Sequence, residues 1–285
     1  MSNFPLRIDI KAAQHDRDWQ NILAYCRDTE AASTFEGFWL FDHFVPINGH
    51  VEGPCMDGWT LLASLASATK RVRLGLMVGC NGYRHPAVLA KIASTVDQVS
   101  DGRLDMGLGA GWFELEYNMY GIPFPRPAQR IHELDEACQV LKLLWAEEQA
   151  SFEGKYYHLK EARHEPKPIQ KPYPPFTIGG GGEKLTLRVV AKHANIYNAP
   201  GGSPEEVRHK NDVLDEHCAT IGRDPNEIRR SWQFYLKSQE EASDVRQRIE
   251  PYLGVGIDHI CIGLPSDHHP GLVEKLADEV RQLLG

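Results

Sequence analysis

Short apolar runs alternate along the chain with longer stretches in which apolar residues recur at helical spacing. The helical stretches include residues 18–33, 60–69, 86–100, 130–145 and 270–284. The strand-like runs lie at residues 6–10, 38–41, 72–78, 104–108, 176–178, 195–198, 229–236 and 259–262. Alternating strands and helices are typical of repeated strand-helix units around a parallel sheet, and eight strands close a TIM barrel. The pattern therefore predicts an α/β protein in which residues 1–285 form a single (β/α)8 barrel domain.

Residues 146–175 interrupt this alternation, because they show little helical period. They contain five prolines, at positions 166, 168, 172, 174 and 175. Proline lacks a backbone N–H and fixes φ, so a helix does not continue through such a segment. We expect a proline-rich insertion between the fourth and fifth strands, packed against the barrel, with a hairpin around Gly154.

Composition and charge narrow the classes of function. The 285 residues are 42% hydrophobic and 25% charged, which is the balance of an ordinary globular protein. The net charge of −8 provides no overall basic field, which argues against nucleic acid as a partner. No stretch approaches the roughly 20 apolar residues of a membrane span, and the N-terminus has no basic patch followed by an apolar run. We expect a cytoplasmic protein that binds a small molecule and no membrane.

Two ionisable residues, Asp42 and His43, follow the second apolar run directly. In barrels of this kind the site is built from the loops that follow the strands, so polar residues there carry the most weight. His43 could exchange protons near neutral pH or stack beside a cofactor ring, with Asp42 setting its tautomer or orienting the loop. The pair could equally cap a helix or a turn, and the residues alone leave both interpretations open.

A second candidate segment follows the third run, at residues 78–86. Gly79 and Gly82 would let the backbone approach a flat ligand closely, and Arg84 and His85 could contact an anion. Glycine and asparagine also commonly make a plain turn, so this structural interpretation is at least as well supported.

A third candidate segment contains three glycines, Gly107, Gly109 and Gly111, followed by Trp112. The spacing is close to the dinucleotide-binding fingerprint, but its sixth position is tryptophan. We expect the glycines to clear room inside the barrel mouth, with Trp112 as a wall of the pocket and Glu114 as a polar contact.

The fourth candidate segment is a run of four glycines at residues 179–182, between a strand and a helix. Successive backbone N–H groups at a helix start form an anion site, and barrels often hold phosphate in a late strand-helix loop. A flexible turn is the alternative. We favour phosphate binding, because glycine costs order in a loop unless close approach is needed.

Metal chemistry finds no support in the sequence. The six cysteines are scattered, without a Cys-x-x-Cys pair or a His/Cys cluster at zinc spacing, which predicts reduced thiols. The segment His132-Glu133-Leu134-Asp135-Glu136 lacks the second histidine of a helical zinc motif.

Together these segments resemble the luciferase-like monooxygenase family, and more closely its deazaflavin-dependent branch. No single segment is specific, but their order and spacing are. The matching positions are Asp42-His43, residues 83–87 (YRHPA), 89–91 (LAK), 100–104 (SDGRL), 107–112 (GLGAGW), 121–125 (GIPFP), Arg130, 144–145 (LW) and 178–183 (IGGGGE).

The resemblance implies a cofactor pocket at the carboxyl ends of the strands, often within a homodimer. It implies coenzyme F420 as the cofactor, with FMN as the alternative, and catalytic roles for His43 and Asp42 near the deazaflavin ring. The region 76–79 often backs the ring with a non-proline cis peptide, and the glycine loop holds the cofactor phosphate. The cofactor-binding residues would be His43, Met77, Val78, Gly79, Gly109, Ala110, Gly111, Trp112, Gly179, Gly180, Gly181 and Gly182.

One departure from the branch affects the substrate. Its sugar-phosphate dehydrogenases place a glutamate directly after the Gly-x-Gly-x-Gly run, where this chain has Trp112, so a sugar phosphate is disfavoured. We expect hydride transfer between F420 and a small organic electrophile, with the chain acting as a reductase. An FMN-dependent monooxygenase and a non-catalytic ligand-binding member of the fold are the alternatives.

Overall fold

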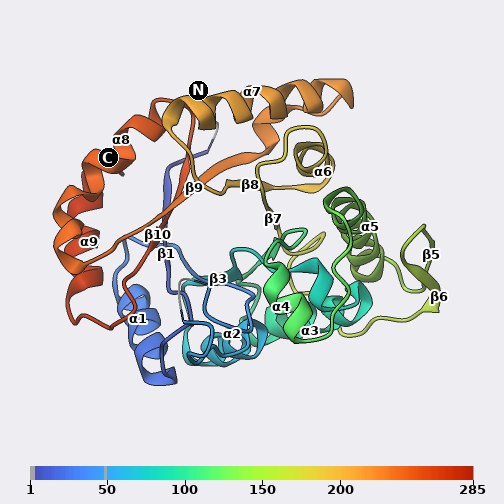
Figure 1. The fold of residues 1–285 in the computed structure, drawn as a ribbon, viewed down its shortest axis with the longest axis horizontal. Coiled ribbons are helices and arrows are strands. Elements are labelled where there is room, and N and C mark those ends of the chain that lie inside the picture. Colours follow the sequence, from blue (N-terminus) through green and yellow to red (C-terminus); the bar gives the residue numbers. More distant parts are fainter. Residues whose placement is uncertain (1–3, 48–49, 285) are drawn as a thin grey trace.

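Eight parallel strands close into a barrel in the computed structural model, which describes residues 4–47 and 50–284 (Figure 1). The barrel order is β1-β10-β9-β8-β7-β4-β3-β2, and β1 pairs with both β10 and β2. The strands are β1 (Arg7–Lys11), β2 (Gly37–Leu40), β3 (Arg73–Leu76), β4 (Leu104–Leu108), β7 (Phe176–Gly179), β8 (Ile196–Ala199), β9 (Arg229–Tyr235) and β10 (His259–Gly263). The predicted α/β class and TIM barrel are confirmed, since each apolar run contains a barrel strand and most strand residues are buried.

Helices surround the barrel and follow its strands (Figure 1). Capping residues set several of their starts: the side chains of Asp18 and Asp57 each accept a backbone N–H three residues on, and Ser203 forms a capping box with Glu206. The helices are α1 (Trp19–Ala31), α2 (Gly58–Ala68), α3 (Pro86–Val99), α4 (Glu114–Met119), α5 (Pro127–Ala146), α6 (Thr186–His193), α7 (Pro204–Thr220), α8 (Val245–Leu253) and α9 (Leu272–Arg281). Single 3-10 turns lie at η1 (Asn81–Tyr83), η2 (Pro225–Glu227) and η3 (Gln239–Asp244).

The proline-rich insertion lies between β4 and β7, where it was expected. Its strands β5 (Ala150–Glu153) and β6 (His158–Ala162) pair antiparallel, so the predicted hairpin around Gly154 is confirmed. The hairpin stands at the edge of the molecule beyond α5 (Figure 1). Phe152 and Leu159 pack against the main core and anchor it there.

Polar side chains fill the lower part of the barrel interior. The buried carboxylate of Asp9 accepts hydrogen bonds from Arg7, from the indole N–H of Trp39 (2.6 Å) and from His259 (2.9 Å). Above this network, Trp39 packs with Met77 and Cys261 in a small apolar cluster. This apolar layer closes the inner end of a cavity at the mouth of the barrel, and Met77 belongs both to the layer and to the cavity lining.

Candidate active site

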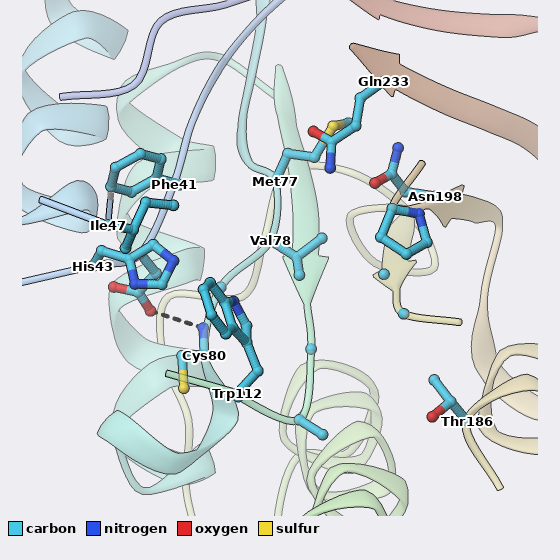
Figure 2. A pocket seen from close by; sticks show the side chains of 18 of the residues that line it. Phe41, His43, Ile47, Met77, Val78, Cys80, Trp112, Thr186, Asn198 and Gln233 are labelled. Carbon is cyan, nitrogen blue, oxygen red and sulfur yellow. Dashed lines mark hydrogen bonds between the residues drawn. The ribbon is translucent and has the colours of Figure 1, made fainter. Parts of the chain in front are cut away.

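A cavity of about 470 Å³ opens at the carboxyl ends of the barrel strands (Figure 2). This volume is within the range of small-molecule and cofactor sites, roughly 300–1,000 Å³. All of the predicted site residues line the cavity except Gly181 and Gly182. His43, Phe41 and Trp112 gather on one side, and Asn198 and Gln233 lie on the other.

His43 projects into the cavity from the loop that follows β2. Its side chain is 12% exposed, and its ring packs edge-on against Phe41 (4.8 Å between centroids) and Trp112 (5.9 Å). Nδ1 lies 2.7 Å from Oε2 of Glu116, on α4. The imidazole is therefore fixed by two aromatic walls and one carboxylate.

The Glu116 carboxylate is fully buried and accepts four hydrogen bonds. The backbone N–H groups of Phe44 (2.6 Å) and Val45 (3.0 Å) donate to Oε1, and the Tyr83 hydroxyl and His43 donate to Oε2. Burial raises the pKa of Glu116, but these hydrogen bonds outweigh it and hold the pKa below its usual range. Because an ionised carboxylate only accepts, Nδ1 of His43 must carry a hydrogen, which leaves Nε2 for the cavity.

Glu116 is a site residue that the sequence reasoning missed. Glu114, which was expected to be the polar contact of this segment, is exposed, whereas Glu116 is buried. Both acids lie in the first turn of α4, next to Tyr117, which is fully buried. The available signal was helical period, since Glu116 and Tyr117 share the inward side of that short helix.

Asp42 does not set the tautomer of His43, so that expectation is wrong. Its buried carboxylate accepts hydrogen bonds from the backbone N–H of Cys80 (2.9 Å) and from Nη1 of Arg84 (2.8 Å). Burial raises the pKa of Asp42, although Arg84 and the Cys80 N–H oppose the rise. The alternative weighed for Asp42, that it orients its loop, fits these contacts, because they join the loop after β2 to the loop after β3.

Arg84 is occupied by protein carboxylates rather than directed at a ligand. Besides Asp42, its guanidinium binds Asp57 at 2.5 Å. His85 accepts the N–H of Ala87 and caps the start of α3. The expected contact of Arg84 and His85 with an anion is therefore not supported by their geometry.

Val78 forms the middle of the cavity wall, and the bond between Met77 and Val78 is a non-proline cis peptide, as the resemblance implies (Figure 2). A Cβ at Gly109 would lie 2.7 Å from a Val78 methyl carbon, and a Cβ at Gly179 would lie 3.1 Å from both. Both glycines line the cavity, and their missing side chains leave the space that Val78 occupies.

The four-glycine loop reaches the cavity only at its start. The Gly180 N–H donates to the carbonyl oxygen of Asn198 (3.4 Å), and Gly181 packs toward Lys210 on α7, which donates to its carbonyl oxygen (3.0 Å). Gly181 and Gly182 are not among the residues that line the cavity, so their part in holding the cofactor phosphate stays a prediction. Thr186, the first residue of α6, lines the cavity instead, and this helix start has no side-chain cap. At this helix start the backbone N–H of Leu187 already donates to the carbonyl oxygen of Gly182 (3.0 Å), whereas the Thr186 side chain is at the cavity.

Within the described ranges, no group of three or more His, Cys, Asp or Glu side chains could hold a metal ion. Over the same residues, the longest and most apolar helices still fall short of what a membrane crossing requires.

Comparison with known proteins places these features in a wider group. The model of the luciferase-like monooxygenase family matches residues 4–283. An F420-dependent glucose-6-phosphate dehydrogenase of Kineococcus radiotolerans is 27% identical over 279 residues, which cover 97% of this chain and 80% of the relative.

Two solved structures share the fold over nearly their whole length. An F420-dependent secondary alcohol dehydrogenase, in complex with an F420-acetone adduct, superposes with a TM-score of 0.87 at 18% identity and covers 98% of this chain and 99% of that one. The coenzyme F420-dependent tetrahydromethanopterin reductase of Methanopyrus kandleri gives a TM-score of 0.82 at 18% identity, over 99% of this chain and 100% of that one. At this identity the likeness shows a common barrel architecture.

Proposed function

Because the chain belongs to the luciferase-like monooxygenase family, we propose that it is an oxidoreductase that transfers a hydride between coenzyme F420 and a small organic substrate, as a reductase. The observation that carries this proposal is a single cavity with His43, tethered by Glu116, on one wall and the uncapped start of α6 on another. The similarity to proteins named as F420-dependent supports the choice of cofactor.

The cavity residues fit such a cofactor. Val78 and Gly79 offer a wall for a flat ring, and Thr186 at the start of α6 would hold a phosphate. When bound, F420 supplies or accepts the hydride. The chain's own task is then to orient the two reactants, exclude water and handle the proton.

His43 is the residue placed to handle that proton. Glu116 holds the hydrogen on Nδ1, so Nε2 can accept a proton from, or return one to, a substrate atom in the cavity. Trp112 and Phe41 pack around the imidazole and limit its rotation. Asp42 acts through the backbone, by fixing the loops that carry His43 and Cys80.

The walls near His43 favour a small, mainly apolar substrate. Phe41, Ile47 and Trp112 line this part of the cavity (Figure 2). Trp112 stands where the sugar-phosphate dehydrogenases of the branch carry a glutamate, so we do not extend the sugar-phosphate substrate of the K. radiotolerans relative to this chain. The homodimer implied by the resemblance stays a prediction.

Cofactor choice is tested by titrating the purified protein with F420, reduced F420 and FMN, followed by fluorescence. We expect F420 to bind at least tenfold more tightly than FMN. The matched variant Thr186→Val removes one hydroxyl at the start of α6 and should weaken F420 binding about five- to tenfold, the size of one hydrogen bond of about 1 kcal/mol. Tight FMN binding with no F420 binding would overturn the proposal in favour of an FMN-dependent monooxygenase.

Glu116→Gln tests the tether on His43. A glutamine amide can turn its N–H2 group toward Nδ1, which would move the ring hydrogen to Nε2, so we expect kcat to fall about 10- to 100-fold with F420 affinity unchanged. The control is Glu114→Gln, an exposed acid on the same helix, which should match the wild type. Equal kcat values for the two variants would exclude the tether from the mechanism.

The same variant predicts a change in acid stability. Because the pKa of Glu116 is lowered on folding, its ionised form stabilises the protein above the ordinary glutamate value of 4.5, and this stabilisation is lost as the pH falls through the lower folded value. Glu116→Gln has no such group, so its melting temperature should drop less than that of the wild type between pH 6 and pH 3. An equal drop in both proteins would contradict the lowered pKa.

A further inference from the structure

Lys11 places a buried ammonium group at the cavity. It is the last residue of β1, it is 3% exposed, and it lines the cavity. Its Nζ donates to the carbonyl oxygen of Met77 (3.0 Å) and to Oε1 of Gln233 on β9 (3.0 Å). Two of the three N–H donors of the ammonium are thereby used.

Over residues 4–47 and 50–284, no carboxylate lies within ion-pair distance of the Lys11 Nζ. Its other neighbours are aromatic faces, with Nζ 5.1 Å from the centroid of Tyr235 and 6.0 Å from that of Phe41. A buried cation without an anion is costly, so a negative group that entered the cavity beside it would be stabilised.

The carboxylates at and beside the cavity have cationic or hydrogen-bonding partners of their own. Asp42 is paired with Arg84, and Glu116 with His43. Arg130 donates to the carbonyl oxygens of Gly111 and Pro125, and its guanidinium lies over the ring of Phe124. Lys11 and Arg130 are therefore the two cavity-lining cations whose partners, among the described residues, are neutral groups, and Lys11 differs in being joined to a second cavity-lining side chain, Gln233.

Gln233 adds a second donor at the same place. Because its Oε1 accepts from Lys11, its N–H2 group must point elsewhere, and the side chain lies on the cavity side opposite His43 (Figure 2). One ammonium N–H and one amide N–H2 can thus converge on a single acceptor. Such a pair suits an oxygen that is anionic or strongly polarised.

We propose that Lys11 and Gln233 bind a carboxylate or carbonyl oxygen of the reacting ligands, which rests on the function proposed above. Two sources share this chemistry: a carboxylate or carbonyl group of the substrate, and a carbonyl oxygen of the cofactor ring. In either case the oxygen is held beside Lys11 and Gln233. Gln233 lies across the cavity from His43 (Figure 2), and the Lys11 ammonium also lies 6.0 Å from the ring of Phe41, which is on the His43 side.

The experiment compares the wild type with Lys11→Met, which keeps an unbranched apolar stem and removes the charge. The control is Lys167→Met, because Lys167 also donates to two backbone carbonyl oxygens, of Leu144 and Glu147, but does not line the cavity. Each protein is titrated with F420, and then with benzoate and benzamide in the presence and absence of F420. Benzoate and benzamide have the same ring and differ in the charge of one group.

If the oxygen belongs to the substrate, the wild type should prefer benzoate to benzamide by about tenfold, the size of one charge-assisted hydrogen bond, and Lys11→Met should lose this preference while it binds F420 normally. If the oxygen belongs to the cofactor, Lys11→Met should weaken F420 binding tenfold or more. Lys167→Met should do neither.

The proposal is overturned if Lys11→Met binds F420 as tightly as the wild type and the benzoate result also fails. The benzoate result fails if the wild type shows no preference for benzoate, or if Lys11→Met keeps that preference. A merely structural role for Lys11 would weaken benzoate and benzamide equally, and this outcome would also refute it. Failure of the wild type to bind F420 would instead refute the proposed function, and the two benzene derivatives would still test Lys11 in the cofactor-free protein.

Discussion

Replacing His43 with alanine should lower kcat for F420-dependent turnover by about 100- to 10,000-fold, the range that a positioned proton donor or acceptor contributes. The imidazole of His43 lies on the aromatic side of the cavity, and its Nε2 is available because Glu116 occupies Nδ1. The measurement is stopped-flow or steady-state turnover of F420 with a panel of small carbonyl and imine compounds. The affinity for F420 should change by no more than a few-fold, because a proton carrier contributes to the reaction more than to binding.

His132→Ala is the matched control, because His132 is an exposed residue of α5 that does not line the cavity. It should behave as the wild type. Undiminished turnover in His43→Ala would remove His43 from the mechanism, and absence of turnover in the wild type over the whole panel would favour a ligand-binding member of the fold.

Gly107→Ala should destabilise the barrel by more than about 4 kcal/mol, or prevent folding. A Cβ at this position on β4 would collide with the carbonyl oxygen of Leu76 on β3. The obstacle is backbone rather than a side-chain end, so no rotamer change relieves it and the two strands would have to separate. Urea unfolding, followed by circular dichroism, measures the free energy of unfolding of both proteins.

The control for this variant is Gly254→Ala, at the end of α8. Gly254 has an ordinary helical φ of −64°, and a Cβ there would meet only the carbonyl oxygen of Pro251, at 3.4 Å. Its free energy of unfolding should stay within about 1 kcal/mol of the wild type. A Gly107→Ala protein as stable as this control would show that β3 and β4 can separate at little cost.

The strands and most of the cavity lining could be predicted from the sequence because both depend on local patterns. Apolar runs gave the eight strands to within a few residues, and glycines after strands marked the cavity wall. The run at 72–78 extends two residues too far at its carboxyl end, since β3 ends at Leu76 and the chain enters the cis peptide. Hydrophobicity alone does not distinguish a strand from the apolar residues that continue it.

The partners within the site could not be predicted, because barrel closure brings them together. Glu116 lies 73 residues from His43, and Lys11 lies 222 residues from Gln233. Asp42 was paired with His43 on sequence proximity, yet neighbours in an extended segment point to opposite sides. Sequence distance therefore identified the right loop but the wrong carboxylate.

The contact between Val78, Gly109 and Gly179 makes three positions on separate strand ends share one volume. A bulkier residue at either glycine fits only if a smaller residue replaces Val78. A bulkier residue at position 78 would meet the backbone of both glycines. In the evolution of this chain, a bulkier residue in that wall thus needs a compensating replacement. Single substitutions that enlarge a side chain there are obstructed, whereas a smaller residue at position 78, alone or paired with a larger one at a glycine, is not.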